Sequence, residues 1–284
     1  MKLLRYGPSG AEKPGLLDAH GGIRCLSEYV SDIDPLTISQ EGLRDLATIE
    51  PEALPLVPGE PRLGSPISGT RQFIAVGLNY SDHAAESNMP VPSEPILFTK
   101  AVSCIQGPND DVRKPFGSTK LDWEVELGIV VGSRANYVDV KEALDHVAGY
   151  LVCDDLSERN FQLERGGTWD KGKGCETFGP VGPWLVTKDE VADVQNLDMW
   201  LRVNGRRMQT GNTKTMIFDC ATLVSYISRF MTLLPGDIIT TGTPPGVGMG
   251  MKPPEFLKEG DVIELGIEKL GSQRHRVIVW NAGR

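Results

Sequence analysis

Apolar residues in this chain either alternate with polar ones or form short continuous runs, and both patterns predict strands. The alternation is clear over residues 71–80, where a strand is expected to end at Gly77, and over residues 197–213, around Asn204-Gly205. An Asn-Gly pair between two alternating stretches is a strong hairpin signal. Further strands are predicted within residues 94–108, 120–132, 147–154 and 235–248, and a last hairpin within residues 259–281.

Helical spacing of apolar residues is confined to short stretches. It favours helices within residues 37–49, 81–87, 140–146 and 220–233. Strands therefore dominate, and they do not alternate regularly with helices, as they do in parallel α/β folds. The pattern predicts a mixed, mainly antiparallel β-fold such as a barrel or roll.

The first 68 residues are predicted to form a unit of their own. Short strands joined by a turn at Gly21-Gly22 precede the polar helical stretch, which gives a small α+β domain. Residues 51–66 are rich in proline and show neither strand nor helix period, so they are expected to be a linker. Residues 69–284 form the second and larger predicted domain.

Charge and composition exclude several classes of protein. A net charge of −9 argues against a nucleic-acid or anionic-membrane partner, since both bind basic surfaces. No apolar run reaches the length of a membrane span or of a signal-peptide core. We therefore expect a cytoplasmic protein. The five scattered cysteines contain no C-x-x-C pair and are expected to be reduced structural thiols.

Two glutamates at the start of a strand raise a question of chemistry. Glu124 and Glu126 are two residues apart, so their side chains share one face of the strand that continues as Val125, Leu127 and Ile129 on the other face. Like charges so placed repel each other. Either the first residues of the strand lie in solvent, or a divalent cation lies between the carboxylates.

A second predicted strand ends in Asp154-Asp155 and could add a third carboxylate. Neighbouring strand residues point to opposite faces, so at most one of the two aspartates joins a common site. An all-oxygen site selects Mg²⁺ or Mn²⁺ over Zn²⁺. Asp122 lies on the same face as Glu124. It is expected either to begin the strand or to contact the metal ligands without binding the metal itself.

The other candidates for chemistry are a histidine and two lysines. His83 and Glu86 would be neighbours if residues 81–87 are helical, which suits a general base and its orienting carboxylate; the alternative is a surface ion pair. Lys171 and Lys173 lie in a glycine-rich stretch that predicts a loop, where one of them could hold a carboxylate or an oxyanion. The remaining histidines, including His275, are expected to be solvated or hydrogen-bonded bystanders. Serine-hydrolase, zinc-protease and phosphate-loop motifs are absent from the sequence.

Five separated segments together resemble the fumarylacetoacetate hydrolase family. They are "VGLNYSDHAAE", "DWEVELGIVVG", "GYLVCDDLSERNFQ", "GKGCETFGPVGPWL" and "LLPGDIITTGTPPGVG", in the family's order and over residues 69–284. The resemblance implies a β-roll or incomplete barrel, usually dimeric, with Mg²⁺ or Mn²⁺ at its mouth. It also implies that residues 1–68 are the small N-terminal domain that many members carry.

The resemblance assigns roles residue by residue. It implies Glu124, Glu126 and Asp155 as metal ligands, His83 as base, Glu86 as its partner, and Lys173 as a catalytic lysine. Tyr80, Gln162, Lys171 and Thr243 are implied on the substrate side. Asp154 and Asn160 depart from the family's usual "NDVSARD" and are not assigned to the metal.

The substrate implied is a small anionic oxo acid. The chain looks most like bacterial hydrolases of 2,4-diketo-3-deoxy sugar acids, of the L-fuconate or L-rhamnonate type, which release pyruvate and a hydroxy acid such as lactate. The alternatives are a ureidoglycolate lyase, an oxaloacetate decarboxylase or acylpyruvase, and a metal-binding module without activity. The substrate tail is expected near residues 88–92 and 208–215.

Overall fold

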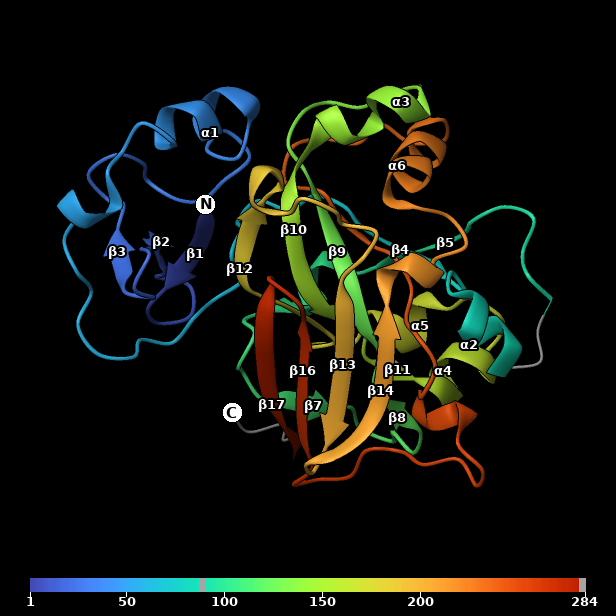
Figure 1. Ribbon diagram of the computed structural model, residues 1–284. Coiled ribbons are helices and arrows are strands. Elements are labelled where there is room, and N and C mark those ends of the chain that lie inside the picture. Colours follow the sequence, from blue (N-terminus) through green and yellow to red (C-terminus); the bar gives the residue numbers. More distant parts are fainter. Residues whose placement is uncertain (87–89, 281–284) are drawn as a thin grey trace.

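The main sheet runs through the whole molecule in the computed structural model, which describes residues 1–86 and 90–280 (Figure 1). Its strand order is β3-β2-β1-β12-β10-β9-β15-β4-β5, with β6 beside β12. Most neighbours are antiparallel, while β15 pairs with β4, and β12 with β6, in parallel. The strands are β1 (Lys2–Tyr6), β2 (Lys13–Leu17), β3 (Ile23–Cys25), β4 (Phe73–Gly77), β5 (Ile96–Lys100), β6 (Ile105–Gln106), β9 (Val125–Val131), β10 (Val147–Asp154), β12 (Gly179–Thr187) and β15 (Ile238–Thr240).

A second sheet packs against strands β9, β10 and β12 of the first. Its order is β14-β13-β16-β17-β7. Its strands are β7 (Val112–Lys114), β13 (Asp198–Val203), β14 (Arg206–Asn212), β16 (Val262–Ile267) and β17 (Gly271–Val279), and a small pair is formed by β8 (Leu121–Asp122) and β11 (Ser157–Glu158). Leu127, Leu201 and Leu265 are fully buried in this core. The two open sheets confirm the predicted mixed, mainly β roll.

Both predicted hairpins are present. β13 and β14 are joined by Asn204 and Gly205, whose φ angles of 51° and 77° are those of the tight turn that such a pair favours. β16 and β17 form the last hairpin. In contrast, β12 was not predicted, because its glycines and prolines are typical of loops. It is nevertheless buried, and it pairs with β1 on one side and β10 on the other.

The N-terminal segment contains the expected short strands and one helix. α1 (Gln40–Leu46) is shorter than the predicted stretch and begins after Ser39, whose side chain accepts a hydrogen bond from the Gly42 amide. β1 pairs with β12, so this segment extends the main sheet rather than only following it in sequence (Figure 1). That residues 1–68 and 69–284 are two separate domains stays a prediction.

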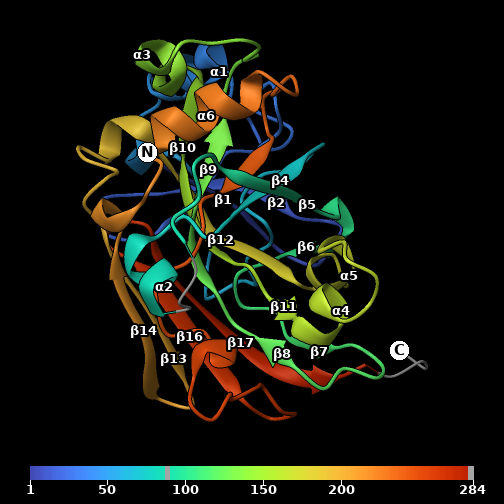
Figure 2. The same cartoon turned by 90° about the vertical axis from the view of Figure 1, so that its right-hand side faces the viewer.

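The remaining helices are short and lie in two groups. α3 (Val140–Ala143) and α6 (Cys220–Ser228) contact each other at one end of the molecule, and α2 (Ser81–Glu86), α4 (Arg159–Leu163) and α5 (Asp170–Lys173) lie beside the sheets (Figures 1 and 2). Lys171 and Lys173 lie in helix α5, so the prediction of a loop for them was wrong. None of the helices in the described part of the chain has the length and apolar character needed to cross a bilayer.

Candidate metal centre and active site

The antiparallel pairing of β9 and β10 explains how carboxylates distant in sequence meet. The start of β9 lies beside the end of β10, with Val125 opposite Asp154 and Glu126 opposite Cys153. The Asp155 amide donates to the Glu124 carbonyl at 2.9 Å. The residues that flank the two strands therefore lie at one edge of the sheet.

Three of these carboxylates form one cluster. Each of Glu124, Glu126 and Asp155 offers an oxygen, and these atoms all lie within 4.8 Å of one another. The residues are only 6%, 2% and 1% exposed. The strand start is thus buried, and the alternative in which it lies in solvent is wrong.

Three cations contact this cluster. The Lys173 ammonium lies 2.6 Å from Glu124 Oε2 and 2.5 Å from Asp155 Oδ2. The Lys100 ammonium lies 2.6 Å from Asp155 Oδ1, and Arg159 Nη2 lies 2.6 Å from Glu124 Oε1. Two of the three carboxylates are therefore held by opposite charges.

Glu126 is held differently. Its Oε2 accepts a hydrogen bond of 2.9 Å from the Gly242 amide, and among the described residues no lysine, arginine or histidine forms an ion pair with it. Burial, together with the charges of Asp155 and Glu124, raises the pKa of Glu126 well above its ordinary value. Burial acts in the same direction on Glu124, but Arg159 and Lys173 outweigh it and lower the pKa of that carboxyl.

This arrangement fits a divalent cation. The donors are all carboxylate oxygens, which Mg²⁺ and Mn²⁺ prefer. A buried negative charge needs a paired positive charge, and none of the described lysine, arginine or histidine side chains forms an ion pair with Glu126. Glu124, Glu126 and Asp155 would hold the ion.

The predicted base lies on helix α2. His83 Nδ1 lies 3.2 Å from Glu86 Oε2, and the two side chains are 12% and 28% exposed. Glu86 Oε2 also accepts a hydrogen bond of 3.1 Å from the Gly246 amide. The loop that follows β15 therefore contacts both Glu86, through Gly246, and the carboxylate cluster, through the Gly242 amide.

The four residues predicted on the substrate side have different surroundings. Gln162 Oε1 accepts from Arg159 Nη1 at 3.0 Å, and Thr243 Oγ1 donates to the Val125 carbonyl at 2.9 Å, so both adjoin the segments that carry the ligands. Lys171, in helix α5, is exposed, and its Nζ donates to the Arg165 carbonyl at 2.6 Å.

Tyr80 is fully buried. Its hydroxyl donates to the Met199 sulfur at 3.1 Å, and burial raises the pKa of the phenol well above its ordinary value. The expected tail region near residues 88–92 lies partly outside the described residues.

Sequence reasoning left Asp122 unassigned and did not single out Arg159 or Lys100. Asp122 is fully buried and accepts hydrogen bonds from the Gly248 amide at 2.6 Å and from Arg159 Nε at 2.8 Å. The sequence signal that could have found these residues was a charged residue beside or within an apolar strand. That signal does not show which strand ends come together in the fold to form the site.

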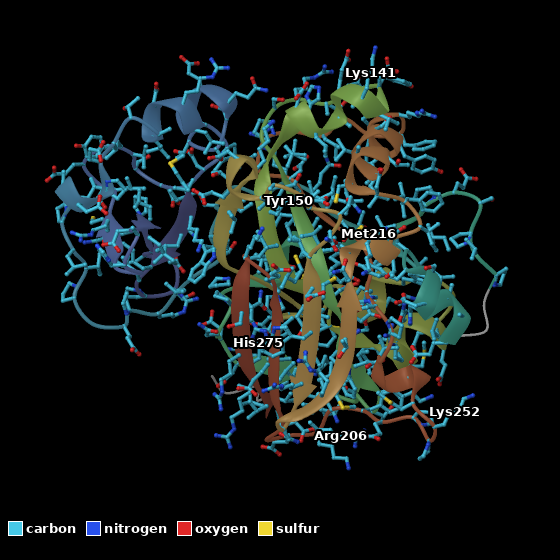
Figure 3. The ribbon with its side chains drawn as sticks, in the orientation of Figure 1. Lys141, Tyr150, Arg206, Met216, Lys252 and His275 are labelled. Carbon is cyan, nitrogen blue, oxygen red and sulfur yellow. The ribbon has the colours of Figure 1, made fainter. Side chains whose placement is uncertain are left out.

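Asp154 lies outside the cluster, as expected. Its Oδ1 accepts from the Glu124 amide at 3.1 Å, and burial raises its pKa to about 8. Of the two alternatives expected for His275, the solvated one is wrong and the hydrogen-bonded one agrees with the structure, because this residue lies on β17 (Figure 3) at 0% exposure. Its Nε2 lies 3.0 Å from Gln273 Oε1, and burial lowers its pKa to about 4. The buried face of β17 carries two polar residues, Gln273 and His275, so no apolar signal in the sequence indicated that the other sheet covers this face.

The fold and the site define a class: a β-rich scaffold with a buried, all-carboxylate metal site beside a histidine–glutamate pair. Comparisons identify the family. Residues 72–278 match the family model described as fumarylacetoacetate (FAA) hydrolase C-terminal. The chain belongs to the fumarylacetoacetate hydrolase family.

Related proteins are similar to this one over almost the whole length of the chain. A protein of Burkholderia cenocepacia (strain HI2424) named "Putative hydrolase" is 61% identical over 97% of this chain and 98% of its own. The structure is similar to fumarylacetoacetate hydrolase from Exiguobacterium antarcticum, at 35% identity and a TM-score of 0.86 over 99% and 100% of the two chains. It is also similar to maleylpyruvate hydrolase from Sphingobium sp. SYK-6, solved with manganese(II) and pyruvate, at 28% identity and a TM-score of 0.83 over 99% and 100%. The family and these names point to an enzyme.

Proposed function

We propose that the protein is a Mg²⁺- or Mn²⁺-dependent hydrolase that cleaves the C3–C4 bond of a 2,4-diketo acid. The products would be pyruvate and a hydroxy acid, such as lactate from a 2,4-diketo-3-deoxy sugar acid of the L-rhamnonate or L-fuconate type. The observation that carries the proposal is the buried carboxylate cluster, connected by one loop to the His83–Glu86 pair. Support comes from the manganese and pyruvate bound to the Sphingobium relative.

The metal site would bind the head group of the substrate. A divalent cation held by Glu124, Glu126 and Asp155 supplies positive charge that polarises keto and carboxylate oxygens. Lys173 adds an ammonium that can donate to an anionic group of the substrate. The two cations together allow an anionic oxo acid to enter a site built from carboxylates.

The His83–Glu86 pair would supply the base. Because Nδ1 faces Glu86 Oε2, the proton of a neutral imidazole is held on Nδ1, which leaves Nε2 free to accept a proton from water. The Gly246 amide fixes the same Glu86 oxygen and so orients the pair. These contacts suit general-base catalysis.

The proposed reaction consumes one water molecule for each C–C bond that it cleaves. His83 removes one proton from water, and the hydroxide forms a bond to C4. The C3–C4 bond then breaks, its electron pair stays on C3 as the pyruvate enolate, and C3 takes up the proton that water lost. The hydroxyl of water ends on the new carboxyl group.

A product screen tests this function. We expect pyruvate and a hydroxy acid from 2,4-diketo-3-deoxy acids with Mg²⁺ or Mn²⁺, and no turnover in excess chelator. Full activity in chelator would remove the metal from the proposal. Pyruvate and carbon dioxide from oxaloacetate alone, or glyoxylate and urea from ureidoglycolate alone, would replace this function with that of a decarboxylase or a lyase.

Variants of the base test the mechanism. His83→Ala should lower kcat roughly 10²–10⁴-fold and leave Mn²⁺ affinity within twofold of the wild type. His20→Ala is the matched control, because His20 is an exposed histidine in the N-terminal segment. Intact turnover in His83→Ala would place the base elsewhere.

A homodimer and a cytoplasmic location are further parts of this proposal.

A further inference from the structure

A fully buried lysine to which the proposed mechanism gives no role lies against the metal site. Lys100 is the last residue of β5, and its side chain is 0% exposed. Burying an ammonium is costly unless all its donors have partners. A lysine in this position of a strand therefore needs a reason beyond packing.

Its ammonium has three partners on two other segments. It lies 2.6 Å from Asp155 Oδ1, and it donates to the Lys173 carbonyl at 2.6 Å and to the Leu156 carbonyl at 3.4 Å. The first and third partners belong to the chain after β10, and the second is the last residue of α5. One side chain thus joins β5 to the segment of a metal ligand and to the helix of Lys173.

Asp155 is oriented from both sides by this arrangement. Lys100 contacts its Oδ1, and Lys173 contacts its Oδ2. A carboxylate held at both oxygens has little freedom to rotate about its last bond. Groups that hold metal ligands in this way commonly affect metal affinity and activity.

β5 also positions helix α5 through its other residues. Thr99 Oγ1 donates to Asp170 Oδ1 at 2.8 Å, at the first residue of the helix. The Phe98 ring lies 5.0 Å from the Lys173 ammonium and packs edge-on against Trp169. The strand thus contacts the helix at both ends and along its catalytic side chain.

We propose that Lys100 is a positioning residue that holds both the metal ligand Asp155 and the backbone of Lys173 in the geometry that the reaction needs. The role in turnover rests on the proposed function, whereas the role at Asp155 does not. Lys100 does not face the substrate directly in this proposal. It acts through the proposed metal ligand Asp155 and through Lys173.

The test uses Lys100→Met, which keeps an unbranched side chain one atom shorter and removes the ammonium. Mn²⁺ affinity is measured by electron paramagnetic resonance on the folded, purified protein, and folding is checked by circular dichroism. We expect the Kd for Mn²⁺ to rise roughly 10–100-fold. At saturating Mn²⁺, kcat should remain at least tenfold lower, with a smaller change in KM, because Lys173 stays displaced.

Two controls separate positioning from a general loss of stability. Leu26→Ala removes a fully buried side chain in the N-terminal segment and should lower Tm while leaving Mn²⁺ affinity within twofold. If Lys100→Met does not fold, Lys100→Gln, which retains a hydrogen-bond donor, is measured by the same criteria.

A Kd for Mn²⁺ within twofold of the wild type in the folded variant would overturn the proposal. The failure of the proposed function would look different: the wild type would bind Mn²⁺, the variant would bind it more weakly, and none of the diketo acids would react.

Discussion

Replacing Glu126 by glutamine should separate the charge of the metal site from the stability of the fold. Glu124, Glu126 and Asp155 each offer a carboxylate oxygen, and these three oxygens lie within 4.8 Å of one another. At an effective dielectric constant of about 20, each pair of carboxylate charges at that distance repels by roughly 3 kcal/mol. Glu126 takes part in two such pairs, which Lys173 offsets only in part.

The pKa of Glu126 determines whether Glu126→Gln raises or lowers the free energy of unfolding. Burial and the charges of Asp155 and Glu124 raise that pKa, so the folded state retains a proton that the unfolded state releases above its ordinary pKa. The free energy of unfolding then falls as pH rises through this window. Glu126→Gln removes the ionisation and keeps an oxygen for the Gly242 amide. In excess chelator at neutral pH, we expect it to be as stable as the wild type, or more stable by about 1–3 kcal/mol.

With metal bound, the wild type should become more stable than Glu126→Gln. A hundredfold excess of free metal over its Kd stabilises a folded protein by about 2.7 kcal/mol, which corresponds to a rise in Tm of roughly 5–10 °C. We expect this rise for the wild type and for Glu259→Gln, which makes the same change on an exposed residue. Glu126→Gln should show almost none of it.

Thermal unfolding by circular dichroism, with Mn²⁺ and with chelator, measures both effects. An equal metal-induced rise in Glu126→Gln and in the wild type would show that Glu126 is not a ligand. A loss of more than about 2 kcal/mol in chelator would show that its charge is compensated in the folded protein, which contradicts the reasoning from repulsion.

Three further predictions concern stability. Burial raises the pKa of Asp154 from 3.8 to about 8, so the free energy of unfolding in chelator should fall as pH rises from about 4 to 8. Urea titrations of Asp154→Asn should show this pH dependence reduced by a few kcal/mol. The same pH dependence in the variant and the wild type would refute the raised pKa of Asp154. Burial lowers the pKa of His275 from 6.5 to about 4, so stability should fall as pH falls through that window, and His275→Gln should flatten this acid dependence. Gly149→Ala would place a Cβ 2.1 Å from the Val186 carbonyl oxygen and should cost roughly 2–4 kcal/mol, whereas a Tm within about 2 °C of the wild type would show that β12 can move aside.

Local patterns predicted much of the secondary structure. Alternation around Asn204-Gly205 predicted the β13–β14 hairpin, and the dominance of strand patterns predicted the mainly β fold. β12 escaped prediction because glycine and proline weaken the local strand signal. Its pairing with β1 and β10 supplies the stabilisation that its own residues lack.

The candidate site was predicted in the same uneven way. Spacing placed Glu124 and Glu126 on one face and His83 near Glu86, since both relations depend only on the period of a strand or helix. The family resemblance selected Asp155 over Asp154. Spacing alone could not decide whether the glutamates were solvated.

The amino-acid sequence by itself determined the kinds of elements, the carboxylates and the base that the site could use. Only the tertiary structure decided that these carboxylates are buried together, that Lys100 and Arg159 join them, and that His275 is enclosed. The physical reason is that periodicity acts over a few residues, whereas burial and charge pairing depend on strands far apart in sequence. Lys100 and Asp155 are 55 positions apart, and only the tertiary structure brings the last residue of β5 to the segment that follows β10, where the two charges lie 2.6 Å apart.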